Sequence, residues 1–296
     1  MIYMIAAMML LPVGDTFAKL LSETLNPLGV TLWRVLAQAA FLVPVSVILR
    51  RRLQGAMLSP IVALSGGLLV ISLTSLIAAF SVMPIATAIA IFFVEPLILT
   101  VLAGLLLGEK AGPRRLIAVG VGLIGALIVI RPGFSSHGWA TVLPLISATA
   151  YALNMIVLKT ATRTRSGLTV QCGTTIYAAF ALVILSGTLG LNGFSGFTPA
   201  VGDTATWLLV LCAGAVAATS FVFIAEAYRA ADATALAPFQ YLEIIMATAL
   251  GFLVFGDFPD ALTWLGVAII LGSGIYIFHR EGQSDTGAPR RKRGGR

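Results

Sequence analysis

Long apolar segments fill most of the chain and are separated by short polar connections. Most are close to the about 20 residues that a helix needs to cross the hydrocarbon core of a bilayer. None alternates apolar and polar residues, as the strands of a membrane barrel do, and helices satisfy their own backbone inside lipid. The pattern therefore predicts ten transmembrane helices, near residues 3–24, 28–49, 60–80, 82–107, 116–130, 138–158, 168–191, 205–228, 233–255 and 262–279.

Composition supports this class. Of 296 residues, 58% are hydrophobic and 10% are charged, and mean hydropathy is +0.99. A soluble domain carries roughly 25% charged residues. The chain is therefore predicted to be an all-α integral membrane protein whose function lies within the bilayer.

Positive charge is distributed unevenly along the chain, which has a net charge of +7. If the segments alternate from a cytoplasmic N-terminus, nearly all basic loop residues fall on the cytoplasmic side, as the positive-inside rule requires. These residues are Arg50, Arg51, Arg52, Lys110, Arg114, Arg115, Arg163, Arg165, Arg229 and Arg280, with Arg131 on the opposite side. Both termini are thus predicted to be cytoplasmic, and the charge requires no nucleic-acid partner.

The last residues, 282–296, are predicted to form a disordered basic cytoplasmic tail. Its arginines and lysine lie among Gly, Ser and Pro, and the segment is too polar to fold alone. Its charge is expected to act as a topology signal. Contact with anionic membrane lipid is the alternative.

The sequence carries no motif for covalent chemistry, phosphate binding or metal ligation. Cys172 and Cys212 lie within apolar segments without a C-x-x-C pattern, and His137 and His279 are single. A P-loop, a G-x-S-x-G and an H-E-x-x-H motif are all missing. We therefore expect no enzyme, no cofactor and no metal site, and assign no catalytic residue.

Two glutamates, Glu95 and Glu243, interrupt apolar segments at matching places in the two halves of the chain. A charge at bilayer depth costs at least about 2.5 to 3.5 kcal/mol, so such residues are usually functional. A shift of 148 residues aligns the two glutamates and brings four further identical pairs into register over 95–108; a shift of 140 pairs Lys19 with Lys159. The chain is therefore predicted to contain two copies of one unit.

Each copy holds five of the ten predicted helices, and this odd number requires opposite orientations in the membrane. Such inverted repeats are common in secondary transporters, whose substrate sites lie near the midplane. We assign residues 1–136 to the first repeat and 137–281 to the second. At 1.5 Å per residue, both glutamates lie roughly 16 Å deep, near the bilayer centre.

Three segments carry a family resemblance: PVGDTFAKLL (residues 12–21), FFVEPLILTVLAGLLLGEK (92–110) and FQYLEIIMATALGFLVFGD (239–257). Together with the helix count and the repeat, they resemble the EamA family of the drug/metabolite transporter superfamily, up to about Glu281. The resemblance implies a carrier of small metabolites in the bacterial inner membrane, with the third, fourth, eighth and ninth helices around the cavity. The family's Trp-Gly pair early in the first helix is replaced here by Val13-Gly14-Asp15.

Glu95 and Glu243 are the principal candidates for substrate binding or proton coupling. They could bind a cationic or amine group, or take up a proton, because a low dielectric disfavours the charged form of a carboxyl group. The alternative is a pair of structural carboxyl groups bonded to neighbouring helices. Phe92, Gln240 and Tyr241 lie near them in sequence and add stacking and hydrogen-bonding groups.

Further polar residues lie elsewhere in the predicted helices. Asp15 and Lys19 are four residues apart and can pair on one helix face; we expect Asp15 near the cavity and Lys19 nearer the outer end. Trp33 and Arg34 are interpreted as an interfacial anchor, with a vestibule as the alternative. Glu226, with Tyr228, is likewise placed at the inner interface, with a gate as the alternative.

Prolines interrupt the helices that carry the glutamates. Pro96 follows Glu95 and Pro238 is five residues before Glu243. Because proline removes a backbone donor and kinks a helix, we expect local distortion at both sites.

The predicted function is secondary-active transport of a small amino-acid-like or vitamin-like metabolite by alternating access, with export as the favoured direction. Import of a vitamin or cofactor precursor such as riboflavin is the alternative. A non-transporting membrane scaffold is a second alternative, which the two costly carboxyl groups disfavour.

Overall fold

The structure is a computed structural model that describes residues 1–108, 138–193, 195–197, 203–231, 242–256 and 260–285, with isolated residues between 117 and 128 and between 236 and 240. The regular elements in these ranges are all helices. In chain order they are α1 (Ile2–Leu21), α2 (Pro27–Ile48), the short 3₁₀ turn η1 (Arg50–Arg52), α3 (Pro60–Phe80), α4 (Ile85–Phe92), α5 (Glu95–Leu107), η2 (Gly138–Thr141), α7 (Val142–Ala161), α8 (Gly167–Leu191), α9 (Thr204–Ala230), α11 (Leu242–Phe255) and α12 (Ala261–Asp285).

Long apolar helices confirm the predicted membrane class. Seven helical stretches among the described residues are long and apolar enough to cross a bilayer, and α11 is a shorter apolar helix. The predicted fifth helix, near 116–130, lies mostly outside the described residues. Helix α12 continues to Asp285, beyond the predicted boundary at residue 281, and residues 286–296 of the predicted tail lie outside the described residues.

The predicted fourth helix is two helices. Helix α4 ends at Phe92 and α5 begins at Glu95, with Phe93 and Val94 in the turn between them. Pro96 lies in the first turn of α5, where its missing N–H removes no helical hydrogen bond. The expected distortion is therefore a break directly before Glu95.

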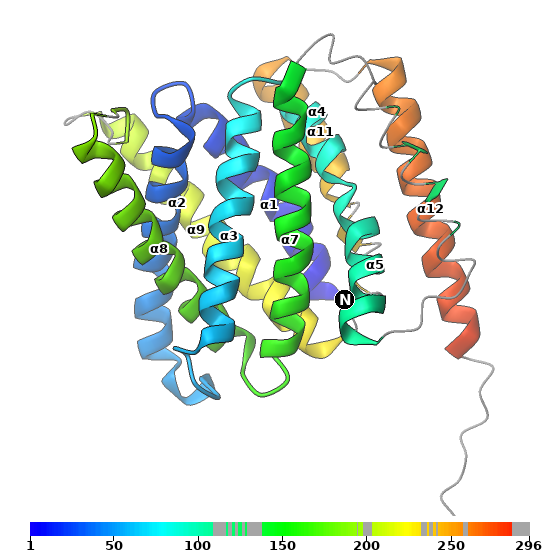
Figure 1. Cartoon of the computed structure of the whole chain (residues 1–296), viewed down its shortest axis with the longest axis horizontal. Helices are drawn as coiled ribbons and strands as arrows, with labels where there is room; N and C mark the ends of the chain where they lie inside the picture. Colours follow the sequence, from blue (N-terminus) through cyan, green and yellow to red (C-terminus); the bar gives the residue numbers. More distant parts are fainter. Residues whose placement is uncertain are drawn as a thin grey trace, which may run out of the picture.

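The helices pack in a bundle whose neighbours are far apart in sequence. Helix α1 packs against α9 and α11, α2 packs against α8 and α9, and α3 packs against α7 and α8. Figure 1 shows α3 and α7 side by side, with α12 at the margin of the bundle. The N-terminus, η1 and the end of α12 lie at one end of the bundle (Figure 1).

Side-chain caps fix the starts of three long helices. The Asn26 side chain accepts a hydrogen bond from Gly29 N (2.7 Å) at the start of α2. Ser166 accepts one from Thr169 N (3.2 Å) at the start of α8, and Asp203 caps α9. These bonds satisfy backbone donors that the first turn of a helix leaves free.

Candidate functional site

Both glutamates lie in the first turn of a helix inside the bundle. Glu95 is the first residue of α5 and Glu243 is the second of α11, and their exposed fractions are 1% and 6%. Backbone N–H groups at a helix start favour a carboxylate. Because α11 packs against both α4 and α1, it lies beside the α4–α5 break that precedes Glu95. The structure thus places both predicted glutamates in the interior.

Gln240 connects the two glutamate-bearing segments. It is buried, its Nε2 donates to the hydroxyl of Tyr228 (3.4 Å), and its side chain lies close enough to the Glu95 carboxyl group to interact with it. Tyr228 has an exposed fraction of 0%, and its placement at the inner interface, two residues before the end of α9, stays a prediction. The other predicted neighbour, Tyr241, lies outside the described residues.

Asp15 forms a buried ion pair with Arg34. The Arg34 Nη1 atom lies 3.0 Å from Asp15 Oδ1, and Arg34 has an exposed fraction of 1%. This burial rules out the predicted interfacial anchor for Arg34. A side-chain Cβ at Gly14 would lie 3.2 Å from Arg34 Nη2, so a glycine at this position leaves room for the guanidinium group.

The other predicted charged residues have partners away from this pair. Lys19 Nζ lies 4.3 Å from the centre of the Phe255 ring, a cation–π contact. Glu226 pairs with Arg229 at 3.3 Å, and both side chains are partly exposed. A gate or an interface thus remains a prediction for Glu226.

Trp33 makes two contacts at its end of α2. Its Nε1 donates to the carbonyl oxygen of Phe197 (2.7 Å), and its ring meets Trp207 edge-on at 4.8 Å between centroids. Trp33 is half-buried. These contacts join α2 to α9 and to the segment before it, which is compatible with the predicted anchor.

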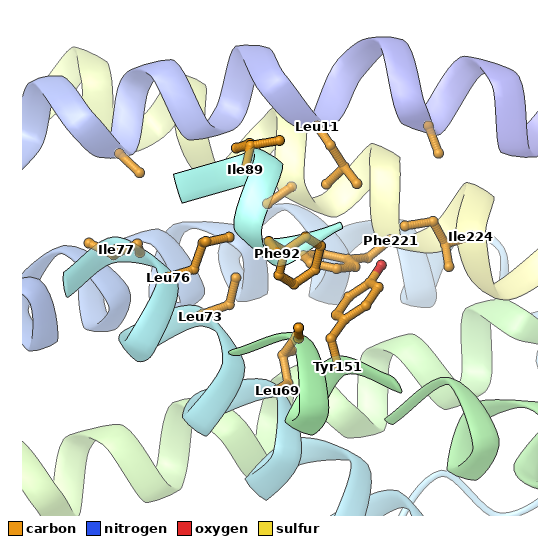
Figure 2. Close-up of a cluster of buried hydrophobic side chains, with 14 of the residues drawn as sticks. Leu11, Leu69, Leu73, Leu76, Ile77, Ile89, Phe92, Tyr151, Phe221 and Ile224 are labelled. Carbon is orange, nitrogen blue, oxygen red and sulfur yellow. The ribbon is translucent and has the colours of Figure 1, made fainter. Parts of the chain in front are cut away.

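Aromatic side chains pack beside the glutamates. The rings of Phe92 and Tyr151 are 5.5 Å apart and edge-on. Figure 2 shows Phe92, Tyr151 and Phe221 together, with the Tyr151 hydroxyl directed toward Phe221 and Ile224. Tyr151 interacts electrostatically with Asp15, Glu95, Glu243 and Tyr228. Sequence reasoning missed Tyr151, because a single tyrosine in an apolar segment gives no signal of its orientation.

Several buried polar atoms of this cluster have no hydrogen-bond partner among the described residues. They are Nε and Nη2 of Arg34, Oε1 of Glu95, Oε1 of Gln240 and the hydroxyl of Tyr151. Each such atom costs about 1 to 3 kcal/mol if nothing bonds to it. Donors and acceptors gathered in this way can bind a polar solute. We call Asp15, Arg34, Glu95, Tyr151, Tyr228, Gln240 and Glu243 the central cluster.

A second group of polar side chains joins α3 to α7 and α8 by neutral hydrogen bonds. Ser65 Oγ donates to Asn154 Oδ1 (2.6 Å), and Thr174 Oγ1 donates to Ser65 Oγ (3.1 Å). Ser72 and Ser147 share a hydrogen bond of 3.1 Å nearby. We call these five residues the neutral seam. Their bonds cross between helices, which the sequence pattern did not predict.

The chemistry of the central cluster suits the binding of a polar solute. Within the described residues no three His, Cys, Asp or Glu side chains form a group that could hold a metal. The ionisable groups are three carboxyl groups, one guanidinium and two phenols. Such a cluster can bind a polar or cationic solute and exchange protons with it.

Comparisons with known proteins agree with this chemistry. A riboflavin transporter of Rhizobium johnstonii is 34% identical over 205 residues, which cover 69% of this chain and 65% of that protein. An S-adenosylmethionine uptake transporter of Rickettsia prowazekii is 25% identical over 92% of this chain and 90% of its own length. A pseudopaline exporter of Pseudomonas aeruginosa is 27% identical over 64% of each chain.

A solved structure and a family model also match this chain. One solved crystal structure superimposes with a TM-score of 0.65 and 17% identity, covering 96% of this chain and 99% of its own. The EamA-like transporter family matches residues 1–131 and again 138–278. The predicted resemblance is therefore confirmed, and the family indicates a transporter and not an enzyme. This multi-pass membrane protein belongs to the EamA-like transporter family.

Proposed function

We propose that the protein is a secondary-active transporter that moves a small metabolite across the bacterial inner membrane by alternating access, with the central cluster as its binding site. The observation that carries this proposal is the burial of three carboxyl groups and one guanidinium group inside the bundle, with two of the carboxyl groups, Glu95 and Glu243, at helix starts. The cluster is closed to solvent, so a solute reaches it only when the surrounding helices rearrange. A scaffold would gain nothing from this costly arrangement.

The packing of the helices supports the proposed inverted repeat of ten helices. If α7, α8 and α9 are the second copies of α1, α2 and α3, the contact of α1 with α9 corresponds to that of α7 with α3. The contact of α2 with α9 likewise corresponds to that of α8 with α3. The caps Asn26 and Ser166 are separated by the same 140 residues as Lys19 and Lys159.

The family match, which occurs once in each half, supports the two proposed repeats, 1–136 and 137–281. We propose that the end with the N-terminus and η1 faces the cytoplasm, because Arg50, Arg51 and Arg52 lie there (Figure 1). The basic residues of 282–296 would then lie in the cytoplasm as well.

We propose a cationic or amine-bearing metabolite as the substrate. Three carboxyl groups face one guanidinium group in the cluster, so the site favours a positive charge on the solute or a proton in its place. The aromatic pair Phe92 and Tyr151 offers a surface for a planar ring. S-adenosylmethionine, a sulfonium cation with a purine ring, has both features.

Uptake is the direction that we propose, in place of the export expected from the sequence. The relative named for uptake aligns over nearly the whole of both chains, whereas the relative named as an exporter aligns over less. Riboflavin uptake is the second candidate, because the relative with 34% identity is a riboflavin transporter. A neutral flavin would use the hydrogen-bonding and aromatic groups more than the carboxyl groups.

Proteoliposomes with the purified protein in known orientation test the proposal. Labelled S-adenosylmethionine, riboflavin and amino acids are supplied outside, with and without a proton gradient. We expect saturable accumulation of S-adenosylmethionine that collapses when the gradient is removed. Riboflavin accumulation in its place would establish the second candidate. Leakage equal to empty liposomes for the whole panel would contradict the transport proposal.

A further inference from the structure

A groove of about 600 Å³ lies away from the central cluster, between α2, α8 and α9. Its volume falls within the roughly 300 to 1,000 Å³ of small-molecule sites. Its walls are apolar along most of its length and include Phe41, Leu42, Val45, Ala218 and Val222. Arginines lie at one end.

The groove forms where two helices separate. A Cβ added to Gly214 of α9 would overlap Ala37 of α2, so the two backbones touch at these residues. Figure 1 shows α9 running obliquely across α2. From this crossing the helices diverge toward the end that carries η1, and Leu168 of α8 lines the gap between them. The contact between Gly214 and Ala37 therefore closes the groove at the end opposite η1.

Helix α9 separates the groove from the central cluster. Its groove residues Thr219, Phe223 and Glu226 lie on one helical face. At 3.6 residues per turn, Phe221, Ile224 and Tyr228 lie on the opposite face. The latter three are buried in the bundle. The groove is thus a separate site and not the inner opening of the central cluster.

Apolar side chains beside the groove face the surrounding lipid. Phe41 and Val45 line it and are 40% and 38% exposed, and Val47 and Ile48 continue the exposed apolar surface. In a membrane protein such a surface contacts acyl chains. The groove therefore opens sideways into one leaflet of the bilayer.

The end of the groove is positively charged. Arg51, Arg52 and Arg229 line it, together with one acidic residue, Glu226, which pairs with Arg229. Three arginines and one glutamate give this end a net charge of +2. Arg51 and Arg52 are exposed and have no acidic partner among the described residues. Arginine binds phosphate oxygens through two parallel hydrogen bonds.

We propose that this groove binds an anionic phospholipid of the leaflet at the arginine-rich end, with one acyl chain between α2 and α9 and the phosphate group at Arg51 and Arg52. Basic pockets between membrane helices bind anionic headgroups in this manner. Tyr3 and Phe223, whose rings are 5.6 Å apart, line the same groove and supply aromatic rings suited to the headgroup level. The chain's own tail does not fit the basic end, because residues 290–293 are also basic.

Native mass spectrometry of the purified full chain measures the headgroup specificity, with phosphatidylglycerol and phosphatidylcholine added separately. Each arginine near the phosphate contributes roughly fivefold in affinity, so Arg51→Gln, Arg52→Gln should weaken phosphatidylglycerol binding by about 25-fold. Phosphatidylcholine binding should change little. Arg50→Gln is the matched control, because Arg50 lies in the same turn but does not line the groove. Equal effects of the double variant and the control would overturn the proposal.

A second pair of variants tests the acyl chain. Thr219→Trp places an indole in the groove from an exposed position, whereas Leu211→Trp places one on the exposed surface of the same helix outside it. We expect Thr219→Trp alone to lower the number of bound phosphatidylglycerol molecules. Inorganic phosphate should not displace the lipid. Displacement by phosphate, or equal lipid binding by both variants, would contradict an acyl-chain site.

Discussion

Two sides of the helical bundle hold buried polar groups in different ways. On the side of α1 and α2, Asp15 and Arg34 form an ion pair. The positions 140 residues later, in α7 and α8, carry Met155 and Thr174. There the polar contacts are the neutral hydrogen bonds of Ser65 with its partners in α7 and α8.

This difference indicates that the two sides have different tasks. Neutral hydrogen bonds do not depend on the protonation of a carboxyl group, so the neutral seam can hold α3, α7 and α8 together throughout a transport cycle. The ion pair depends on both charges, and a buried charge without its partner is strongly destabilising. We therefore interpret the α1–α2 side as the one that responds to a proton or a charged solute.

Breaking the ion pair should have the largest effect. Arg34→Gln leaves the Asp15 carboxylate buried without its partner and should cost about 3 to 5 kcal/mol of stability. Asp15→Met, Arg34→Thr copies the second half of the chain and should restore much of the stability, because no unpaired charge remains. Thermal unfolding in detergent measures both variants.

The same two variants separate stability from function. The double variant should fold and yet fail to transport, since it lacks the charges that respond to the solute. Arg163→Gln, in the exposed turn after α7, controls for loss of a positive charge. An Arg34→Gln variant as stable as the parent protein, or a double variant with full transport, would remove the proposed difference between the two sides.

Removing the Ser65 hydrogen bonds of the neutral seam should have a smaller effect on stability. Ser65→Ala leaves Asn154 Oδ1 and Thr174 Oγ1 without their bonds to Ser65, which should cost about 1 to 3 kcal/mol. Transport per folded molecule should remain close to that of the parent protein. Measured transport and thermal unfolding of the same preparation check this. A folded Ser65→Ala variant without transport would place the seam in the transport site.

The helix caps offer a comparison between the two proposed copies, with a still smaller expected effect. Asn26→Ala and Ser166→Ala each remove a cap, at positions 140 residues apart, and should each cost about 1 kcal/mol. Thr188→Ala, an exposed position in α8, is the control. Two unequal costs that differ by several-fold would argue against equivalent roles in the two copies.

The charged cap of α9 should show the smallest effect, and only in acid. Hydrogen bonds from the hydroxyl and the backbone N–H of Thr206 lower the pKa of Asp203. Because the pKa of Asp203 is lower in the folded than in the unfolded protein, its carboxylate stabilises the fold. This stabilisation is complete above the pKa of the unfolded state, about 3.9, and is lost as the pH falls through the pKa of the folded state. Asp203→Asn should remove this acid dependence from thermal unfolding curves. Identical curves for both proteins at every pH would contradict it.

The sequence predicted the long helices, the interior position of both glutamates and the distortion beside Pro96. These features depend on local pattern: apolar length, a rare charge at depth and a residue without an N–H group. The burial of Arg34 and Tyr228 inside the bundle was not predicted. Almost every position in these segments is apolar, so the pattern gives little sign of which face of a helix points inward.

The contacts of the central cluster and the neutral seam could not be derived from the sequence for a related reason. Arg34 meets Asp15 across two consecutive helices, α1 and α2, and Ser65 meets Asn154 because α3 and α7, which are distant in sequence, pack together. Lys19 is closer to Asp15 in sequence than Arg34 is. A pair between Asp15 and Lys19 on one helix was therefore the simpler expectation. Tertiary packing decided which cation reached the carboxylate.

The central claim is that Glu95 and Glu243 form part of a transport site, and the double variant Glu95→Gln, Glu243→Gln tests it most directly. The amide keeps the shape and hydrogen-bonding capacity of the side chain but cannot carry the charge. Transport is measured in vesicles with equal amounts of folded protein between about pH 5.5 and 8. We predict a sharp loss of transport or an altered pH dependence with unchanged thermal unfolding, and a larger share of the effect from Glu243. Unchanged transport across this range would show that the two glutamates are only structural.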